Sequence, residues 1–158
     1  MGLMSLSTLC LECGLCCDGT LFRRVKISAP ERAELVALGI GVGEQKQHDV
    51  MWLPCGKLSG KCCGIYEARP GGCRRFVCAL GERLVRNEVS LEEAREHVVE
   101  MQERIATLRE VFPPPGGEPV LRHARASIDS TTTKVSQAQL EAFQRVEEIR
   151  YAVFMPPP

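Results

Sequence analysis

The chain of 158 residues is long enough for one domain with a helical appendage, and it can bury a modest core. It holds 20 lysine and arginine residues and 20 aspartate and glutamate residues, so its formal net charge is zero. This balance argues against a general nucleic-acid binder, because that class shows a clear basic excess. The sequence has no apolar run of membrane-spanning length and no basic signal-peptide start. We therefore expect a soluble, cytoplasmic protein.

All nine cysteines lie between Cys10 and Cys78, at a density otherwise typical of disulfide-bonded scaffolds. Three observations oppose disulfides: the count is odd, no export signal is visible, and the cytosol keeps thiols reduced. Closely spaced cysteines in that setting are more typical of metal ligands. We therefore expect thiolate metal binding, and disulfides are the less favoured alternative.

The first cysteine segment, CLECGLCCDG, spaces Cys10, Cys13 and Cys16 three residues apart and adds Cys17 directly after them. Gly14 allows the backbone to curl so that its N–H groups point at sulfur. Neighbouring side chains point in different directions, so one natural geometry has Cys16 and Cys17 binding two adjacent metal ions. The CxxCxxCC spacing is a strong indication of a metal site.

Two short elements are predicted next along the chain. The segment LFRRVKI, residues 21–27, alternates apolar and polar residues and favours a strand. The segment APERAELVALG favours a short helix that begins near Pro30 and stops at Gly39.

The second cysteine segment is PCGKLSGKCCGIYEARPGGCRRFVC, residues 54–78. Its stretch from Cys63 to Cys78, taken with CxxCxxCC and the FRRV after it, resembles the YkgJ-like CxxCxxCC cysteine-cluster family. The resemblance covers about residues 10–80 and implies a domain that chelates zinc or iron, with no settled reaction. Cys62 is extra to the family pattern and is predicted to be a bystander.

We predict that the eight other cysteines are the metal ligands. They are Cys10, Cys13, Cys16, Cys17, Cys55, Cys63, Cys73 and Cys78. They could supply two four-thiolate zinc sites, or one iron–sulfur cluster with cysteines left over. Zinc, with two ions, is favoured because Cys17 and Asp18 break the pattern by which a bacterial ferredoxin run continues. Four-thiolate zinc leaves no position for water, so no catalytic residue is predicted.

The stretch from residue 57 to residue 86 carries a net charge of +5. Thiolate-bound zinc is anionic, so guanidinium groups nearby would offset its charge and donate hydrogen bonds to sulfur. Arg74, beside Cys73, is the strongest candidate for this role, and Arg69, Tyr66 and Glu67 are the others placed around the ligands. The less favoured alternative is a solvated basic face that contacts nucleic acid.

The C-terminal half predicts two helices. Ser90 and Glu93 form a capping box that opens the first, and Ser136 and Gln139 form one that opens the second, which runs to about Phe154. Between the helices we predict a Pro/Gly-rich linker over residues 113–135. The first helix has apolar residues spaced by three and four, typical of a packing seam. We expect the helices to pair antiparallel within one chain, which would be a monomer or a weak homodimer.

Together these features predict a mainly α fold with little β. A small, irregular, metal-organised domain spans residues 1–86, and a helical extension spans residues 87–158. Two functions remain open. One is a zinc protein in which the metal is structural or redox-sensing. The other is an iron–sulfur oxidoreductase, or an electron-transfer subunit of a larger enzyme.

Overall fold

The computed structural model describes residues 2–155 of the chain. The ends of the predicted domain ranges, residue 1 and residues 156–158, lie outside the described residues. More than half of residues 2–155 are helical and only 16 of them lie in strands, so the predicted mainly α class with little β is confirmed. The contacts divide the chain into a cysteine unit, residues 10–77, and a helical unit formed by the residues before Cys10 and those from Cys78 onward.

A helix and a turn carry the first cysteine segment. Helix α1 (Gly2–Cys13) ends where Gly14 adopts a left-handed backbone conformation, with φ of 70°. The Gly14 carbonyl accepts the backbone N–H groups of Cys17 at 2.9 Å and Asp18 at 3.0 Å. The turn predicted at Gly14 is therefore present, but these two N–H groups bond to a carbonyl oxygen and not to sulfur as predicted. Glycine suits the turn because an L side chain is strained at this φ.

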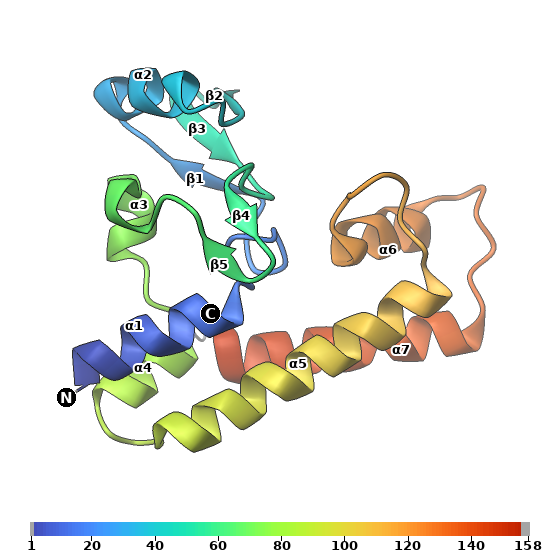
Figure 1. Ribbon diagram of the computed structural model, residues 1–158. Helices are drawn as coiled ribbons and strands as arrows, with labels where there is room; N and C mark the ends of the chain where they lie inside the picture. The colour runs from blue at the N-terminus through green and yellow to red at the C-terminus, as the bar shows by residue number, and fades with distance from the viewer. Residues whose placement is uncertain (1, 156–158) are drawn as a thin grey trace. The chain divides into compact units, whose positions relative to one another are not determined.

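A three-stranded antiparallel sheet forms the centre of the cysteine unit. Its strands are β1 (Arg24–Lys26), β2 (Val42–Gln45) and β3 (His48–Trp52), in the order β1-β3-β2. Strand β3 thus lies between β1 and β2 (Figure 1). Val25 pairs with Met51 on one side of β3, and Gly43 pairs with Val50 on the other. The sequence predicted β1 and did not predict β2 or β3.

Helix α2 (Ala29–Ala37) packs on strands β3 and β2. Its N-cap residue is Ser28, whose backbone N–H donates to the Glu31 carboxylate at 2.7 Å, completing a capping box. Gly39 follows the helix with a φ of 71°. The helix predicted between Pro30 and Gly39 is therefore confirmed.

The second cysteine segment forms a hairpin and two short helices. Strands β4 (Leu58–Ser59) and β5 (Cys62–Cys63) pair antiparallel. A 3₁₀ turn, η1 (Tyr66–Ala68), and helix α3 (Gly71–Arg75) follow, and α3 packs on β1 (Figure 1).

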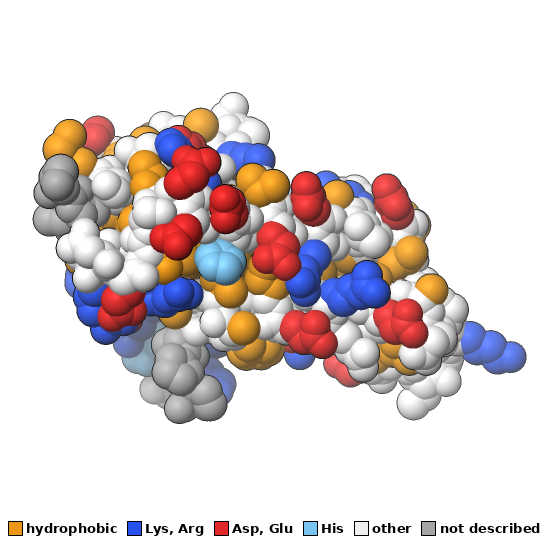
Figure 2. All heavy atoms as spheres, turned by 90° about the horizontal axis from the view of Figure 1, so that it is seen from below, with side chains coloured by type: hydrophobic (Ala, Val, Ile, Leu, Met, Phe, Trp, Pro, Cys, Tyr) orange, Lys and Arg blue, Asp and Glu red, His pale blue; other side chains and the backbone are white. Residues whose placement is uncertain are grey.

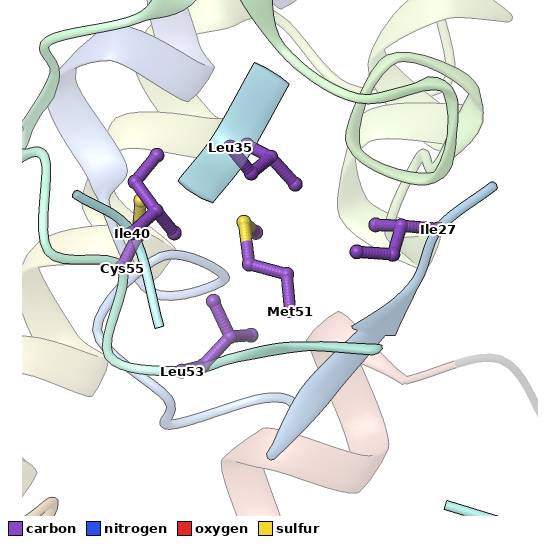
Figure 3. Packing of buried hydrophobic residues seen from close by; sticks show 6 residues of the cluster. All are labelled: Ile27, Leu35, Ile40, Met51, Leu53 and Cys55. Carbon is purple, nitrogen blue, oxygen red and sulfur yellow. The ribbon is translucent and has the colours of Figure 1, made fainter. Parts of the chain in front are cut away.

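The core of the cysteine unit is a small apolar cluster between α2, the sheet and the segment after β3. Cys17 and Cys73 pack against it from outside. Figure 3 shows the six buried members, which are Ile27, Leu35, Ile40, Met51, Leu53 and Cys55. A cysteine is thus part of the core itself.

The helical unit contains the predicted capping boxes. Ser90 accepts the Glu93 N–H at 3.1 Å, and Ser136 accepts the Gln139 N–H at 3.2 Å. These residues open the two predicted helices, and both helices are confirmed. The unit's elements from Cys78 onward are α4 (Ala79–Val85), α5 (Leu91–Val111), α6 (Val120–Asp129), α7 (Gln137–Ile149) and the π-helical turn η2 (Arg150–Phe154).

Helices α5 and α7 form an antiparallel pair. Gln139, at the start of α7, donates from Nε2 to the Val111 carbonyl at the end of α5, at 2.8 Å. Further along, Arg104 donates to the Arg145 carbonyl at 2.6 Å. The predicted pairing within one chain is therefore confirmed. Among residues 2–155, no helix is both long enough and apolar enough to cross a membrane.

The linker predicted over residues 113–135 is wrong in its middle part, because α6 occupies Val120–Asp129. This helix buries Val120, Leu121 and Ala124, and it packs on α5 and α7. The prediction missed this helix because its sequence, VLRHARASID, is short and mixes apolar with basic residues after a stretch of prolines and glycines. The Pro/Gly-rich stretch before Pro119 does leave the helical conformation, as predicted.

Candidate metal centre

Cys17 lies where the first cysteine segment meets the second. Its backbone carbonyl accepts the N–H of Cys55 at 2.8 Å, and its half-buried side chain packs against the apolar cluster. Burial raises the pKa of the Cys17 thiol to about 12, and the nearby Cys63, Cys73 and Cys55 contribute to the increase. The cysteines that raise the pKa of Cys17 thus all belong to the second cysteine segment.

Cys73 has the same neighbours. Burial raises the pKa of its thiol to about 11, Cys55 and Cys63 raise it further, and the positive charge of Arg69 acts in the opposite direction. Cys55 and Cys63 therefore lie close enough to act on both Cys17 and Cys73. We call these four residues the inner cysteine group.

Two glycines and a carboxylate position Cys73. A Cβ atom on Gly72 would lie 2.8 Å from the Lys26 carbonyl oxygen and would collide with the Val25 side chain, so only glycine lets α3 pack this closely on β1. The Gly71 N–H donates to Glu31 at 2.5 Å and lowers the pKa of that carboxyl. Glu31 thereby joins the start of α2 to the start of α3. Sequence reasoning missed Gly72 and Glu31, because their contacts are distant along the chain.

A hairpin positions Cys55 and Cys63. The Cys55 carbonyl accepts the Leu58 N–H at 3.0 Å, which starts the turn into β4. Cys63 pairs with Leu58 across the hairpin, and the Gly64 N–H donates to the Lys57 carbonyl at 2.8 Å. Cys55 is buried, with 8% of its surface exposed, and Cys63 is half-buried.

The inner cysteine group fits the donor set of a thiolate metal site. Four cysteine sulfurs are the usual ligands of structural zinc, and none of the nine cysteines, all within the described part, is in a disulfide. Across residues 2–155, no three His, Cys, Asp or Glu side chains are already arranged as they would be around an ion. Protonated thiols are uncharged and form only weak hydrogen bonds, so no strong interaction draws their sulfurs together. A metal ion that displaces those protons would draw the sulfurs together.

Three other predicted ligands lie at the end of α1 and in the turn after it. Cys10 and Cys13 are on the last turn of α1, and Cys16 follows Gly14. Cys62, predicted to be a bystander, lies near them, because its thiol donates to the carbonyl oxygen of Leu11 at 3.6 Å.

Cys78 belongs to the helical unit rather than to the cysteine unit. It is the N-cap of α4, where its sulfur accepts the Gly81 N–H at 3.4 Å. Burial raises the pKa of this thiol, while the Gly81 and Leu80 N–H groups act against the increase. Capping thus gives Cys78 a structural role, and its role as a ligand stays a prediction.

The two arginines predicted around the ligands differ in their contacts. Arg69 lies with its guanidinium carbon 3.5 Å from the centre of the Tyr66 ring, and its charge acts on Cys73. Arg74 instead donates to the carbonyl oxygens of Glu67 and Arg69, each at 2.6 Å. Arg69 is therefore the arginine whose charge acts on a thiol of the inner cysteine group. Arg74 instead links η1 to the start of α3 through its hydrogen bonds to backbone carbonyls.

The basic stretch from residue 57 to residue 86 does not form a single element. Its last members, Arg83 and Arg86, belong to α4 and its C-cap in the helical unit, where Arg86 pairs with Glu88 at 3.0 Å. Figure 2 shows acidic and basic side chains interspersed over one face of the molecule. That face therefore has no extended patch of one sign.

Residues 9–103 match the model of a family named CxxCxxCC and described as "Putative zinc- or iron-chelating domain". The match covers more than half of the 158 residues. The chain belongs to the CxxCxxCC family. The resemblance seen in the sequence is thus confirmed, and membership supports metal binding in general by this CxxCxxCC protein. No curated protein and no solved structure matches the chain.

Proposed function

We propose that this CxxCxxCC protein binds zinc through the inner cysteine group, and that the metal both organises the cysteine unit and responds to thiol oxidation. The observation that carries the proposal is that Cys17 and Cys73 pack against the apolar cluster that contains Cys55, and that Cys55 and Cys63 both act on the thiols of Cys17 and Cys73. These residues come from a turn, a loop, a strand and a helix. Four thiolates close the tetrahedral coordination of zinc.

The small apolar core supports a structural role for the metal. The buried cluster of the cysteine unit has six members, one of which is Cys55. Domains of this size with small cores commonly need a metal or disulfides for stability. Zinc bound by the inner cysteine group would link the start of the unit to its end. Such binding contributes folding free energy on the order of 10 kcal/mol.

The same thiolates can respond to a peroxide. In that step two zinc-bound thiolates lose two electrons and their sulfurs form a disulfide bond. The O–O bond of the peroxide breaks and takes up two protons from solvent, which gives two water molecules from hydrogen peroxide, or water and an alcohol from an organic hydroperoxide. A zinc ion held by the group would thereby lose two of its four ligands and would be released. The proposal places the protein in a reducing compartment, such as the cytoplasm, where reduced thiols are the resting state.

An iron–sulfur cluster is the alternative occupant, because four cysteine thiolates also ligate iron. Zinc is preferred because a bacterial ferredoxin motif continues CxxCxxC with a separated fourth cysteine followed by proline. In this chain Cys17 and Asp18 follow Cys16 directly and break that motif. The two occupants lead to different functions. Zinc supports a structural or sensing role, and an iron–sulfur cluster supports electron transfer.

Metal analysis of the full chain, purified without oxygen, tests the proposal. We expect a colourless protein that contains zinc, and we expect hydrogen peroxide to release that zinc to a chromogenic chelator as the thiol titre falls. A brown protein that contains iron and acid-labile sulfide would contradict zinc and would show that the bound group is an iron–sulfur cluster. A folded protein that takes up neither metal would overturn metal binding altogether.

A further inference from the structure

We propose that Cys62 is a ligand of a second, outer metal site, which it forms with Cys10, Cys13 and Cys16. This inference rests on the proposed function, and it assigns a role to a cysteine that lies outside the family pattern. We call these four residues the outer cysteine group. The first evidence is the position of the β4–β5 hairpin.

The hairpin turn packs directly on the end of α1. A Cβ atom on Gly14 would lie 3.1 Å from the Cα atom and from the carbonyl oxygen of Lys61, so the two backbones are in close contact. The next residue, Cys62, has its sulfur 3.6 Å from the Leu11 carbonyl oxygen. Both contacts lie within the cysteine unit. They bring Cys62 to the helical turn that carries the first two cysteines.

The spacing on α1 places Cys10 and Cys13 beside Leu11 on that last turn. Residues three apart on a helix lie on the same side, so these two sulfurs can bind a common ion. Cys16 follows Gly14 by two residues, in the turn whose N–H groups close on the Gly14 carbonyl. Cys10, Cys13 and Cys16 thus lie in the end of α1 and the turn after it, and Cys62 contacts this part of the chain through Leu11.

Strand geometry separates Cys62 from Cys63. In the hairpin Cys62 pairs with Ser59, and Cys63 pairs with Leu58. Successive side chains of a strand point to opposite faces. Cys63 influences Cys17, whereas Cys62 contacts α1. The neighbours therefore belong to different groups.

The same division applies to Cys16 and Cys17. Cys17 packs against the apolar cluster that contains Cys55, and we assign its neighbour Cys16 to the outer cysteine group. Each adjacent pair of cysteines then gives one sulfur to each site. Eight cysteines make two sets of four, and Cys78 remains as the cap of α4 in the other unit.

Burial gives the two sites different properties. In the outer cysteine group Cys10 and Cys62 are exposed and the other two members are half-buried, whereas the inner cysteine group has no exposed member and its Cys55 is buried. Metal in the outer site would therefore exchange faster with chelators in solution. The outer site would be the first to lose its ion, and the inner site would keep the fold.

Cobalt titration of the reduced full chain tests the assignment, with Co²⁺ as the probe and thiolate-to-cobalt absorption as the readout. We expect the wild type to bind two equivalents. Cys62→Ser should bind the outer equivalent at least tenfold more weakly and keep the inner one unchanged. Cys63→Ser should lose the inner equivalent instead. Cys78→Ser is the control and should bind both equivalents as the wild type does.

Alkylation of the wild type provides a second readout that needs no variant. With zinc bound, Cys62 and Cys10 should be protected from iodoacetamide, although both are exposed. Peptide mass spectrometry measures the protection. Labelling of Cys62 at the same rate with and without zinc, or wild-type cobalt binding by Cys62→Ser, would refute the outer site alone. A wild type without thiolate-bound cobalt would refute the proposed function as well.

Discussion

Gly14 lies against Lys61 so closely that a Cβ atom on Gly14 would come within 3.1 Å of the Lys61 backbone. Gly14 also has a φ of 70°, which L side chains rarely adopt. One glycine therefore turns the chain after α1 and seats the β4–β5 hairpin against it. Through this contact the first cysteine segment is brought to the second.

Gly14→Ala should destabilise the cysteine unit, because it adds backbone strain and a collision with the hairpin. We expect a loss of at least about 2 kcal/mol in the free energy of unfolding, and weaker cobalt binding. The matched control is Gly60→Ala. Gly60 is on the same hairpin with a φ of 59°, and a Cβ atom there would meet no atom within 4 Å.

Gly60→Ala should cost only the strain of the left-handed conformation, about 1 kcal/mol. Urea unfolding of both variants with zinc bound measures the difference. Equal losses for the two variants would mean that the contact between Gly14 and Lys61 has no energetic weight.

Removal of the metal should unfold the cysteine unit and leave the helical unit folded. The helical unit has its own core, whose fully buried side chains include Leu80, Met101, Leu108, Val146 and Phe154. Hydrogen exchange followed by mass spectrometry should show loss of protection over residues 10–77 when a strong chelator is added. Chelator already saturated with zinc is the control. Unchanged protection over that range would show that the fold does not need the metal.

Metal affinity should fall as the pH falls. The pKa values of Cys17 and Cys73, about 12 and about 11, leave both thiols protonated at neutral pH before metal binds. Binding then releases at least these two protons. Each unit decrease in pH should therefore weaken zinc binding by at least about 100-fold, and the trend should hold up to about pH 11. Competition with a chromophoric chelator, corrected for that chelator's own protonation, measures it. A zinc affinity that does not change between pH 6 and pH 8 would contradict this prediction, because it would show that the thiols are already ionised before the metal binds.

The features that the sequence predicted correctly depend on near neighbours in the chain. Ser90 with Glu93, and Ser136 with Gln139, cap helices three residues away, and Gly14 turns the residues directly after it. Such signals are complete within a few residues. The antiparallel pairing of α5 and α7 followed from the apolar stripe that each of the two helices carries, because such a stripe needs a partner to bury it.

The features that the sequence did not predict depend on distant contacts. Strands β4 and β5 have two residues each, too few to show an alternating pattern, and they form because Leu58 meets Cys63. The grouping of Cys17 with Cys63 and Cys73 needs the hairpin, which positions Cys63, and the Gly72 contact with β1, which positions Cys73. No spacing rule contains either contact. Cys62 was set aside because the family pattern omits it, yet its position follows from the hairpin.

Met101→Ala should destabilise the helical unit, because Met101 is fully buried on α5 and truncation leaves a cavity. We expect a loss of about 2–5 kcal/mol in the free energy of unfolding. Val99→Ala, on the exposed side of the same helix at 51% exposure, is the control and should cost about 0.5 kcal/mol. Urea unfolding with chelator present, followed by circular dichroism, isolates the helical unit. If Val99→Ala cost as much as Met101→Ala, the orientation of α5 would be wrong.

The central claim is that Cys17, Cys55, Cys63 and Cys73 bind one metal ion. Zinc-edge X-ray absorption on a variant that combines Cys10→Ser, Cys13→Ser and Cys62→Ser tests it most directly, because the inner cysteine group remains intact. We expect one zinc per chain with four sulfur neighbours at about 2.3 Å. A zinc shell with nitrogen or oxygen neighbours, or no retained zinc in a folded variant, would contradict the claim.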